Sequence, residues 1–164
     1  MNENLIANAR LYASRRGLEL AETLGSGKDG IVLVAKHKAK PANLAVKVFR
    51  LDEPYLREKQ VYERLKGLGV EAVIGFNVPQ LVGFDDDLRV IAMTIVKRPF
   101  VLDFAGAYPD KRPEFPPEVW ADWEEEKREQ FEGRWPMVEK ILAAFEELGI
   151  YLLDVSPGNI AFLE

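Results

Sequence analysis

Apolar positions along the first 96 residues recur mostly with the spacing of strands. Residues 18–49 alternate apolar and polar positions and contain two β-branched runs, which predicts a three-stranded antiparallel meander. Residues 78–84 and 88–96 predict two further strands joined by an acidic turn. Helical spacing predicts a short amphipathic helix over residues 1–17 and a longer helix over residues 52–69. Five strands with one inserted helix are therefore expected between residues 18 and 96.

From Lys97 onward the pattern changes. Residues 97–117 are rich in proline toward their end and predict a loop with little regular structure. Residues 118–131 predict a charged, mostly solvated helix. Residues 136–149 predict a helix that packs on a core, because apolar side chains recur at helical spacing: Val138, Ile141, Leu142, Phe145 and Leu148. A domain boundary is expected near residues 96–101, between a β-rich part and a helical part.

Composition limits the classes of function. The chain has 164 residues, enough for one domain or two small lobes, and its net charge of −5 argues against a sequence-independent nucleic-acid binder. No apolar run is long enough for a membrane span, and the N-terminal segment lacks the order of a secretory signal. The chain has no cysteine and one histidine, His37, so thiolate and multi-histidine metal sites are excluded. We expect a cytoplasmic protein with no nucleic-acid or membrane partner.

Three glycines, Gly25, Gly27 and Gly30, form a Gly-x-Gly-x-x-Gly sequence between the first two predicted strands. An ordinary glycine-rich hairpin turn is one explanation. A dinucleotide-binding fold needs a helix after the last glycine, and the β-branched run after Gly30 excludes it. The other explanation is a strand–loop–strand flap, whose backbone N–H groups approach the oxygens of a triphosphate. Val32 would then pack on a nucleotide base.

Lys47 lies between two valines in the third predicted strand, so its side chain and theirs point to opposite faces. A solvated sheet face would explain this lysine, since most lysines are exposed. Glu58 offers another explanation, because it lies on the apolar stripe of the helix over residues 52–69. A buried carboxylate needs a partner, since an unpaired buried charge is costly. We therefore expect a Lys47–Glu58 ion pair, with Glu63 as a less well placed alternative.

The last predicted feature is a pair of polar residues, Asp154 and Asn159, around a Pro157–Gly158 turn. At this spacing, an aspartate can orient an attacking hydroxyl and an asparagine can bind a metal ion during phosphoryl transfer. A loop in which the aspartate caps backbone groups and the asparagine fills a turn is the alternative.

In this order, the glycine loop, the Ala45-Val46-Lys47 strand, the helix with Glu58 and the Asp154…Asn159 tail resemble the protein-kinase-like superfamily. The resemblance runs from about residue 18 to the end. It implies an α+β, protein-kinase-like fold: a five-stranded antiparallel N-lobe over residues 18–96 with one αC-type helix. A hinge over residues 97–101 and a mostly helical C-lobe over residues 102–164 would follow, after the N-terminal helix over residues 1–17.

The resemblance also implies ATP and Mg²⁺ as cofactors. Lys47 would hold the α- and β-phosphates and pair with Glu58, Asp154 would act on a substrate hydroxyl, and Asn159 would bind magnesium. Met93 would be the gatekeeper, with adenine against the backbone of Thr94 to Val96. The nucleotide contacts expected in this way are Gly25, Gly27, Gly30, Val32, Ala45, Lys47, Met93, Thr94 and Val96.

The chain departs from the family pattern in two places. Leu152 and Leu153 stand where many family members have His-Arg before the aspartate. The aspartate of Asp-Phe-Gly, the second metal ligand, should follow Asn159 by about a dozen residues. Only five residues remain, so this ligand and the activation segment are expected to be absent and the C-lobe truncated.

Three interpretations follow. One is a minimal kinase that transfers phosphate from ATP to a hydroxyl, with catalysis weakened by the missing ligand. Another is an inactive pseudokinase that acts as a scaffold, with self-association or a protein partner through the uncovered apolar side of the helix over residues 136–149. The third is that the chain is a fragment of a longer protein.

Overall fold

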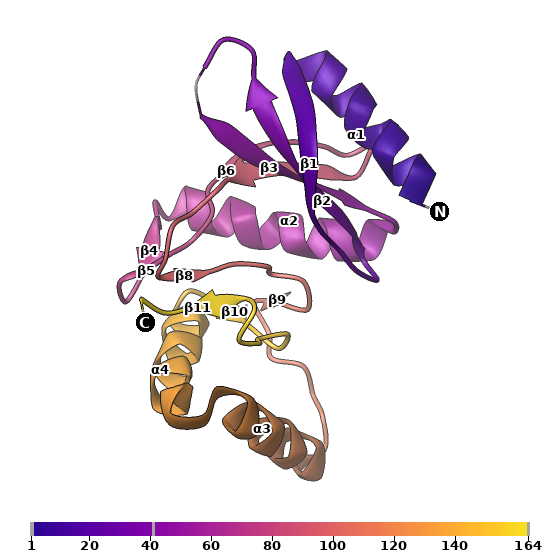
Figure 1. Ribbon diagram of the computed structural model, residues 1–164. Helices are drawn as coiled ribbons and strands as arrows, with labels where there is room; N and C mark the ends of the chain where they lie inside the picture. The colour runs from indigo at the N-terminus through magenta and orange to yellow at the C-terminus, as the bar shows by residue number, and fades with distance from the viewer. Residues whose placement is uncertain (1, 41, 164) are drawn as a thin grey trace.

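A computed structural model describes residues 2–40 and 42–163 of the chain. The protein is α+β, and its largest sheet has five antiparallel strands in the order β1-β2-β3-β7-β6 (Figure 1). These strands are β1 (Leu18–Ser26), β2 (Gly30–His37), β3 (Asn43–Phe49), β6 (Leu81–Asp85) and β7 (Val90–Thr94). The five strands predicted from the sequence are therefore present, within a few residues of their expected bounds.

The two faces of this sheet are covered by different helices. Helix α1 (Asn2–Arg16) packs on one face and α2 (Asp52–Gly67) on the other (Figure 1). Successive residues of β3 point to opposite faces, as the pleat requires. Val46 and Val48 lie in the core beneath α1, whereas Lys47 points to the side of α2.

Helix α2 turns one apolar stripe toward the sheet. It begins with two acidic residues, which interact favourably with the helix dipole, and has basic residues in its last turn. The buried residues recur every three or four positions: Tyr55, Glu58, Val61, Tyr62 and Leu65. Glu58 is thus the one acid on a stripe that is otherwise apolar and aromatic.

Short strands, which the sequence pattern does not predict, join distant parts of the chain. A four-stranded sheet has the order β11-β8-β5-β4, and β10 pairs with β9. These are β4 (Ala72–Val73), β5 (Phe76–Asn77), β8 (Phe100–Val101), β9 (Tyr108–Pro109), β10 (Ile150–Tyr151) and β11 (Ile160–Ala161). The segment 97–117, expected to be a loop, therefore contains two strands, and each pairs with a strand of the C-terminal tail.

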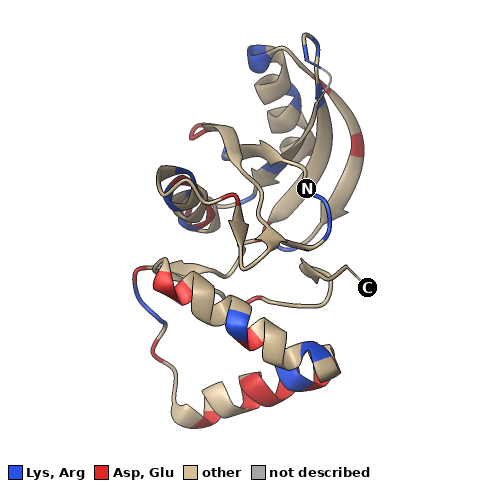
Figure 2. Cartoon of the chain, turned by 90° about the vertical axis from the view of Figure 1, so that its left-hand side faces the viewer, with Lys and Arg blue, Asp and Glu red and all other residues tan. Residues whose placement is uncertain are grey.

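The helical part consists of α3 (Pro117–Phe131), a 3₁₀ turn (Glu132–Arg134) and α4 (Trp135–Glu147). Charged positions run along α3 (Figure 2), and most of its side chains are exposed, as predicted. The apolar stripe of α4 is buried within the chain: Trp135, Val138, Ile141 and Phe145. Self-association or a protein partner stays a prediction, but this stripe does not supply the surface for it.

A continuous buried cluster extends from the sheet through α2 to α4 and includes Phe49, Tyr62, Phe104 and Phe145. The core therefore crosses the predicted boundary at residues 96–101.

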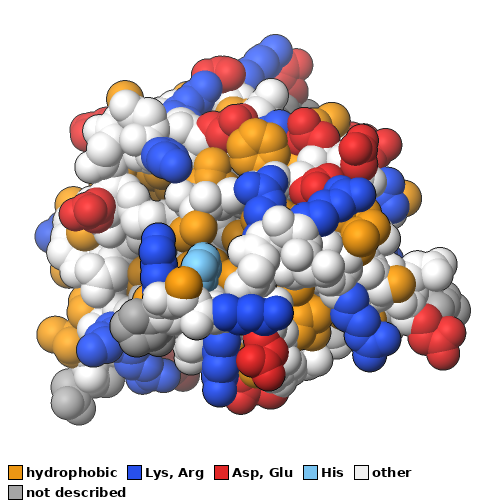
Figure 3. All heavy atoms as spheres, turned by 90° about the horizontal axis from the view of Figure 1, so that it is seen from above, with side chains coloured by type: hydrophobic (Ala, Val, Ile, Leu, Met, Phe, Trp, Pro, Cys, Tyr) orange, Lys and Arg blue, Asp and Glu red, His pale blue; other side chains and the backbone are white. Residues whose placement is uncertain are grey.

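In the described part of the chain, no helix has the length and apolar character needed to cross a membrane. Seen from above, the surface mixes basic and acidic side chains without a region of one sign, and the histidine is visible there (Figure 3).

Gly30 is required by the close approach of two strands. A Cβ atom at this position would lie 1.8 Å from the main-chain oxygen of Val48 on the neighbouring strand. Because the clash is with backbone, we expect Gly30→Ala to lower the free energy of unfolding by about 3 kcal/mol or more. Gly27→Ala is the matched control, since a Cβ there meets nothing within 4 Å. Urea denaturation of both variants tests this, and equal stabilities would contradict it.

Candidate functional site

Two adjoining hollows lie between the five-stranded sheet and the C-terminal tail, with volumes of about 460 Å³ and 260 Å³. The larger is mostly apolar, and the glycine loop between β1 and β2 borders the smaller one. All of the residues predicted for the site line one or both: Gly25, Gly27, Gly30, Val32, Ala45, Lys47, Glu58, Met93, Thr94, Val96, Asp154 and Asn159. The fold thus brings together residues that are distant in the sequence.

The Lys47–Glu58 ion pair expected from the sequence is present. The Nζ atom of Lys47 lies 2.9 Å from Oε1 of Glu58, and both residues are buried. Burial acts to lower the pKa of Lys47, but the carboxylates of Glu58 and Asp103 outweigh this effect and leave the pKa raised. Lys47 therefore stays charged and available to bind an anion.

Of the two partners, Glu58 is the one whose charge is less well compensated. Its side chain is 1% exposed, and in the described part of the chain its Oε2 atom has no hydrogen-bond partner. Burial raises the pKa of Glu58 to about 6, although Lys47 acts to lower it. The carboxylate is kept at the wall of the larger hollow by the charge of Lys47.

Asp103 is a site residue that the sequence reasoning missed. Its Oδ1 atom lies 3.3 Å from Nζ of Lys47 and accepts a hydrogen bond from the backbone N–H of Ala105 at 3.1 Å. It has a positive φ of 68°, in the left-handed region that few residues other than glycine adopt. Asp103 lines both hollows, so its carboxylate lies where they meet.

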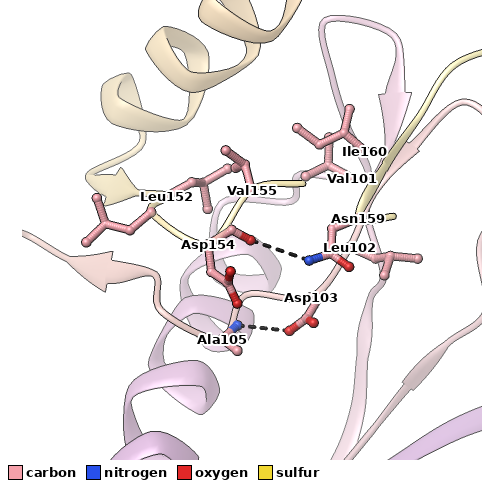
Figure 4. Close-up of a pocket in the computed structure, with 10 residues that line it drawn as sticks. Val101, Leu102, Asp103, Ala105, Leu152, Asp154, Val155, Asn159 and Ile160 are labelled. Atoms are coloured by element: carbon pink, nitrogen blue, oxygen red, sulfur yellow. Dashed lines mark hydrogen bonds between the residues drawn. The ribbon is translucent and has the colours of Figure 1, made fainter. Parts of the chain in front are cut away.

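The pairing of β8 with β11 places Asp103 beside the tail. Val101 is opposite Ile160, and the N–H of Leu102 donates to the carbonyl oxygen of Asn159 at 2.9 Å. Figure 4 shows Asp103, Asp154 and Asn159 around one small hollow, which all three line. Two carboxylates and one amide from separate segments therefore converge.

Gly106 lets the Asp103 turn approach the tail closely. It has a φ of +74°, and a Cβ atom there would lie 3.0 Å from Cβ of Asp154. Phe104, between them, is buried against Tyr62 of α2 and Phe145 of α4, with ring centroids 5.2 Å and 5.8 Å away. Phe104 thus anchors the turn in the core while Asp103 faces the hollow.

One sequence signal could have revealed this turn. Residues 103–106 read Asp-Phe-Ala-Gly, which resembles the Asp-Phe-Gly expected about a dozen residues after Asn159. The segment stands before the two C-terminal helices rather than after them, and only the β8–β11 pairing brings it beside Asn159.

The glycine loop is held by Arg50, which follows β3. Its Nε and Nη2 atoms donate to the carbonyl oxygens of Lys28 and Gly27, each at 3.2 Å. Its backbone N–H donates to the carbonyl oxygen of Asp29 at 2.9 Å. These bonds fix the tip of the loop beside the smaller hollow before any ligand binds.

The site contains apolar side chains, a cation and oxygen ligands, which are the groups that a nucleotide with magnesium would need. Leu24, Val32, Ala45 and Met93 line an apolar slot in the larger hollow, which Lys47 also lines. Among residues 2–40 and 42–163, no cluster of three or more acidic or histidine side chains could hold a metal by itself. Magnesium is commonly held by one or two carboxylates together with phosphate oxygens, and Asp103 and Asn159 offer oxygen atoms of that kind.

A scan against protein-family models found no family that matches the chain, and a search of curated proteins found none with significant similarity. The interpretation of the site therefore rests on its own geometry.

Glu58 should make the stability of the protein depend on pH. Its pKa rises from 4.5 to about 6 on folding, so its contribution is fully present below pH 4.5 and is lost as pH rises through 6. This change corresponds to about 2 kcal/mol. We expect the free energy of unfolding of the wild type, relative to Glu58→Gln, to fall by about that amount between about pH 4 and pH 7.

Urea denaturation across this pH range measures the difference. Glu63→Gln on the same helix is the control, because it removes the same charge at an exposed position. A difference for Glu58→Gln that is flat, or that grows as pH rises, would contradict the assignment.

Proposed function

We propose that this protein is a protein-kinase-like enzyme that binds ATP with Mg²⁺ and transfers the γ-phosphate to a hydroxyl group. One observation carries the proposal: Lys47 contacts both Glu58 and Asp103 in a cleft that Asp154 and Asn159 also line. A lysine–glutamate pair and a metal-binding aspartate are the two elements that kinase chemistry requires together.

The role of Asp103 changes the expectation from sequence. The sequence predicts that the metal-binding aspartate of Asp-Phe-Gly is absent after Asn159 and that catalysis is weak for that reason. Asp103 and Phe104 have the chemistry of that motif, and they reach the site from the segment before α3. The spatial set of Lys47, Glu58, Asp103, Asp154 and Asn159 thus supports phosphoryl transfer despite the order of the segments in the chain.

Each residue has a distinct task in this proposal. The apolar slot binds the base, Lys47 and the N–H groups of the glycine loop bind phosphate oxygens, and Asp103 and Asn159 hold the magnesium ion. Bound magnesium neutralises the charge of the phosphates. Asp154, exposed at the edge of the smaller hollow, orients the acceptor hydroxyl and accepts its proton.

Nucleotide binding tests the first half of the proposal. ATP should raise the melting temperature of the wild type, and Mg²⁺ should enlarge the rise, because a ligand of the folded state stabilises it by mass action. Asp103→Asn should weaken Mg·ATP binding about tenfold or more, through loss of a metal ligand. Asp87→Asn, an exposed acid in the β6–β7 turn, removes the same charge and should bind normally. No shift with the wild type at millimolar ATP would refute nucleotide binding.

Turnover tests the second half. Asp154→Asn keeps the shape of the side chain but removes the proton acceptor, so we expect kcat to fall by about 10²- to 10⁴-fold with little change in the KM for ATP. Radiolabelled transfer from ATP to a panel of small hydroxyl compounds and peptides measures this. Turnover that does not depend on Asp154 would contradict the proposed chemistry. Binding without turnover would favour a pseudokinase.

A further inference from the structure

The segment Leu152–Val155 carries Asp154 and is held mainly at its ends. Leu152 and Val155 are buried, whereas Asp154 is exposed between them. In the part of the chain that the structure describes, two side chains donate hydrogen bonds to carbonyl oxygens of this segment, and no main-chain N–H does so. The shorter of the two comes from Trp123, whose Nε1 atom lies 3.0 Å from the carbonyl oxygen of Leu153.

Trp123 is itself firmly placed. It lies on the inward side of α3, with Lys127 and Phe131 one and two turns further along the same side. Its ring packs edge-on against Trp135, the buried first residue of α4, with centroids 6.4 Å apart. Tryptophan has a single donor, so the position of the ring fixes the direction of its hydrogen bond.

The carbonyl oxygen of Leu153 belongs to the same rigid peptide plane as the N–H of Asp154. A donor that holds this oxygen therefore restricts rotation about the N–Cα bond of Asp154. This rotation sets the direction in which the Asp154 side chain leaves the main chain. The second bond, from Nδ2 of Asn159 to the carbonyl oxygen of Asp154, is longer at 3.4 Å and restrains the next plane less.

We propose that Trp123 is a positioning residue for Asp154. Its indole N–H donates to the carbonyl oxygen of Leu153. Helix α3 thereby supports Asp154, which lies outside the helix. The catalytic consequence rests on the proposed function, whereas the restraint on the main chain does not. Small displacements of a reacting group lower rates steeply, about 10²-fold for 1 Å, so such a restraint would act on kcat.

The test removes the donor and keeps the ring. Trp123 is replaced by 3-benzothienylalanine, in which sulfur takes the place of the indole N–H, and Trp120 by the same residue as control. Trp120 also packs in the aromatic row, 5.9 Å from Trp123. Relaxation of ¹⁵N in the Asp154 and Val155 amides reports order on the sub-nanosecond scale. We expect their order parameters to fall from about 0.85 to about 0.6 or less on replacement at 123, and to stay unchanged on replacement at 120.

Kinetics supply the second readout. Replacement at 123 should lower kcat about tenfold or more and leave the KM for ATP within about twofold, because the nucleotide contacts are elsewhere. Replacement at 120 should change neither. Order parameters that stay high at Asp154 and Val155, or an unchanged kcat in an active enzyme, would overturn the proposal. If the wild type shows no turnover, the proposed function fails, and the relaxation data alone decide the role of Trp123.

Discussion

The arrangement of the site depends on keeping one positive charge buried in the wall of the cleft. Lys47 projects from the middle of the sheet. Its ammonium group can remain charged there only because carboxylates lie close to it. Glu58 is brought by α2, and Asp103 by a turn on the other side of the cleft. The ion pairs thus couple the sheet, the helix and the C-terminal part. Removing one partner of the buried Lys47–Glu58 pair would cost about 3–5 kcal/mol. In the proposed function, phosphate oxygens of ATP would balance part of the charge of Lys47 as well.

The elements with strong periodicity were predictable. The meander over residues 18–49 is marked by its alternation and its β-branched runs, and helices α2 and α4 each bury one stripe that is visible as period 3.6 in the sequence. The two-residue strands were not predictable, because they are too short to show a period and, apart from the β4–β5 pair, their partners are far along the chain. The proline-rich segment 97–117 therefore looked like a simple loop, although β8 within it is central to the second sheet.

The same distinction explains which site residues were found. Glu58 could be paired with Lys47 because a lone acid on an apolar stripe needs a cation, and both lie in periodic elements. Asp103 follows a strand that the pattern did not show, and its relation to Asn159 exists only through the pairing of β8 with β11. The position of Trp123 could not be predicted for another reason. Helix α3 is mostly charged and exposed, so one ring that points inward does not produce a recognisable apolar pattern.

The late position of β11 has a consequence for biosynthesis. Segments emerge from the ribosome in order, and contacts between distant segments form slowly because a long loop must close first. The sheet, α2 and Lys47 can form early. Asp103 is placed beside Asn159 only after β11 has paired with β8. Before β11 pairs with β8, the glycine loop and Lys47 would be in place without Asn159 beside Asp103. The hollow that Asp103, Asp154 and Asn159 line is therefore completed only when β8 and β11, which are far apart in the chain, have paired.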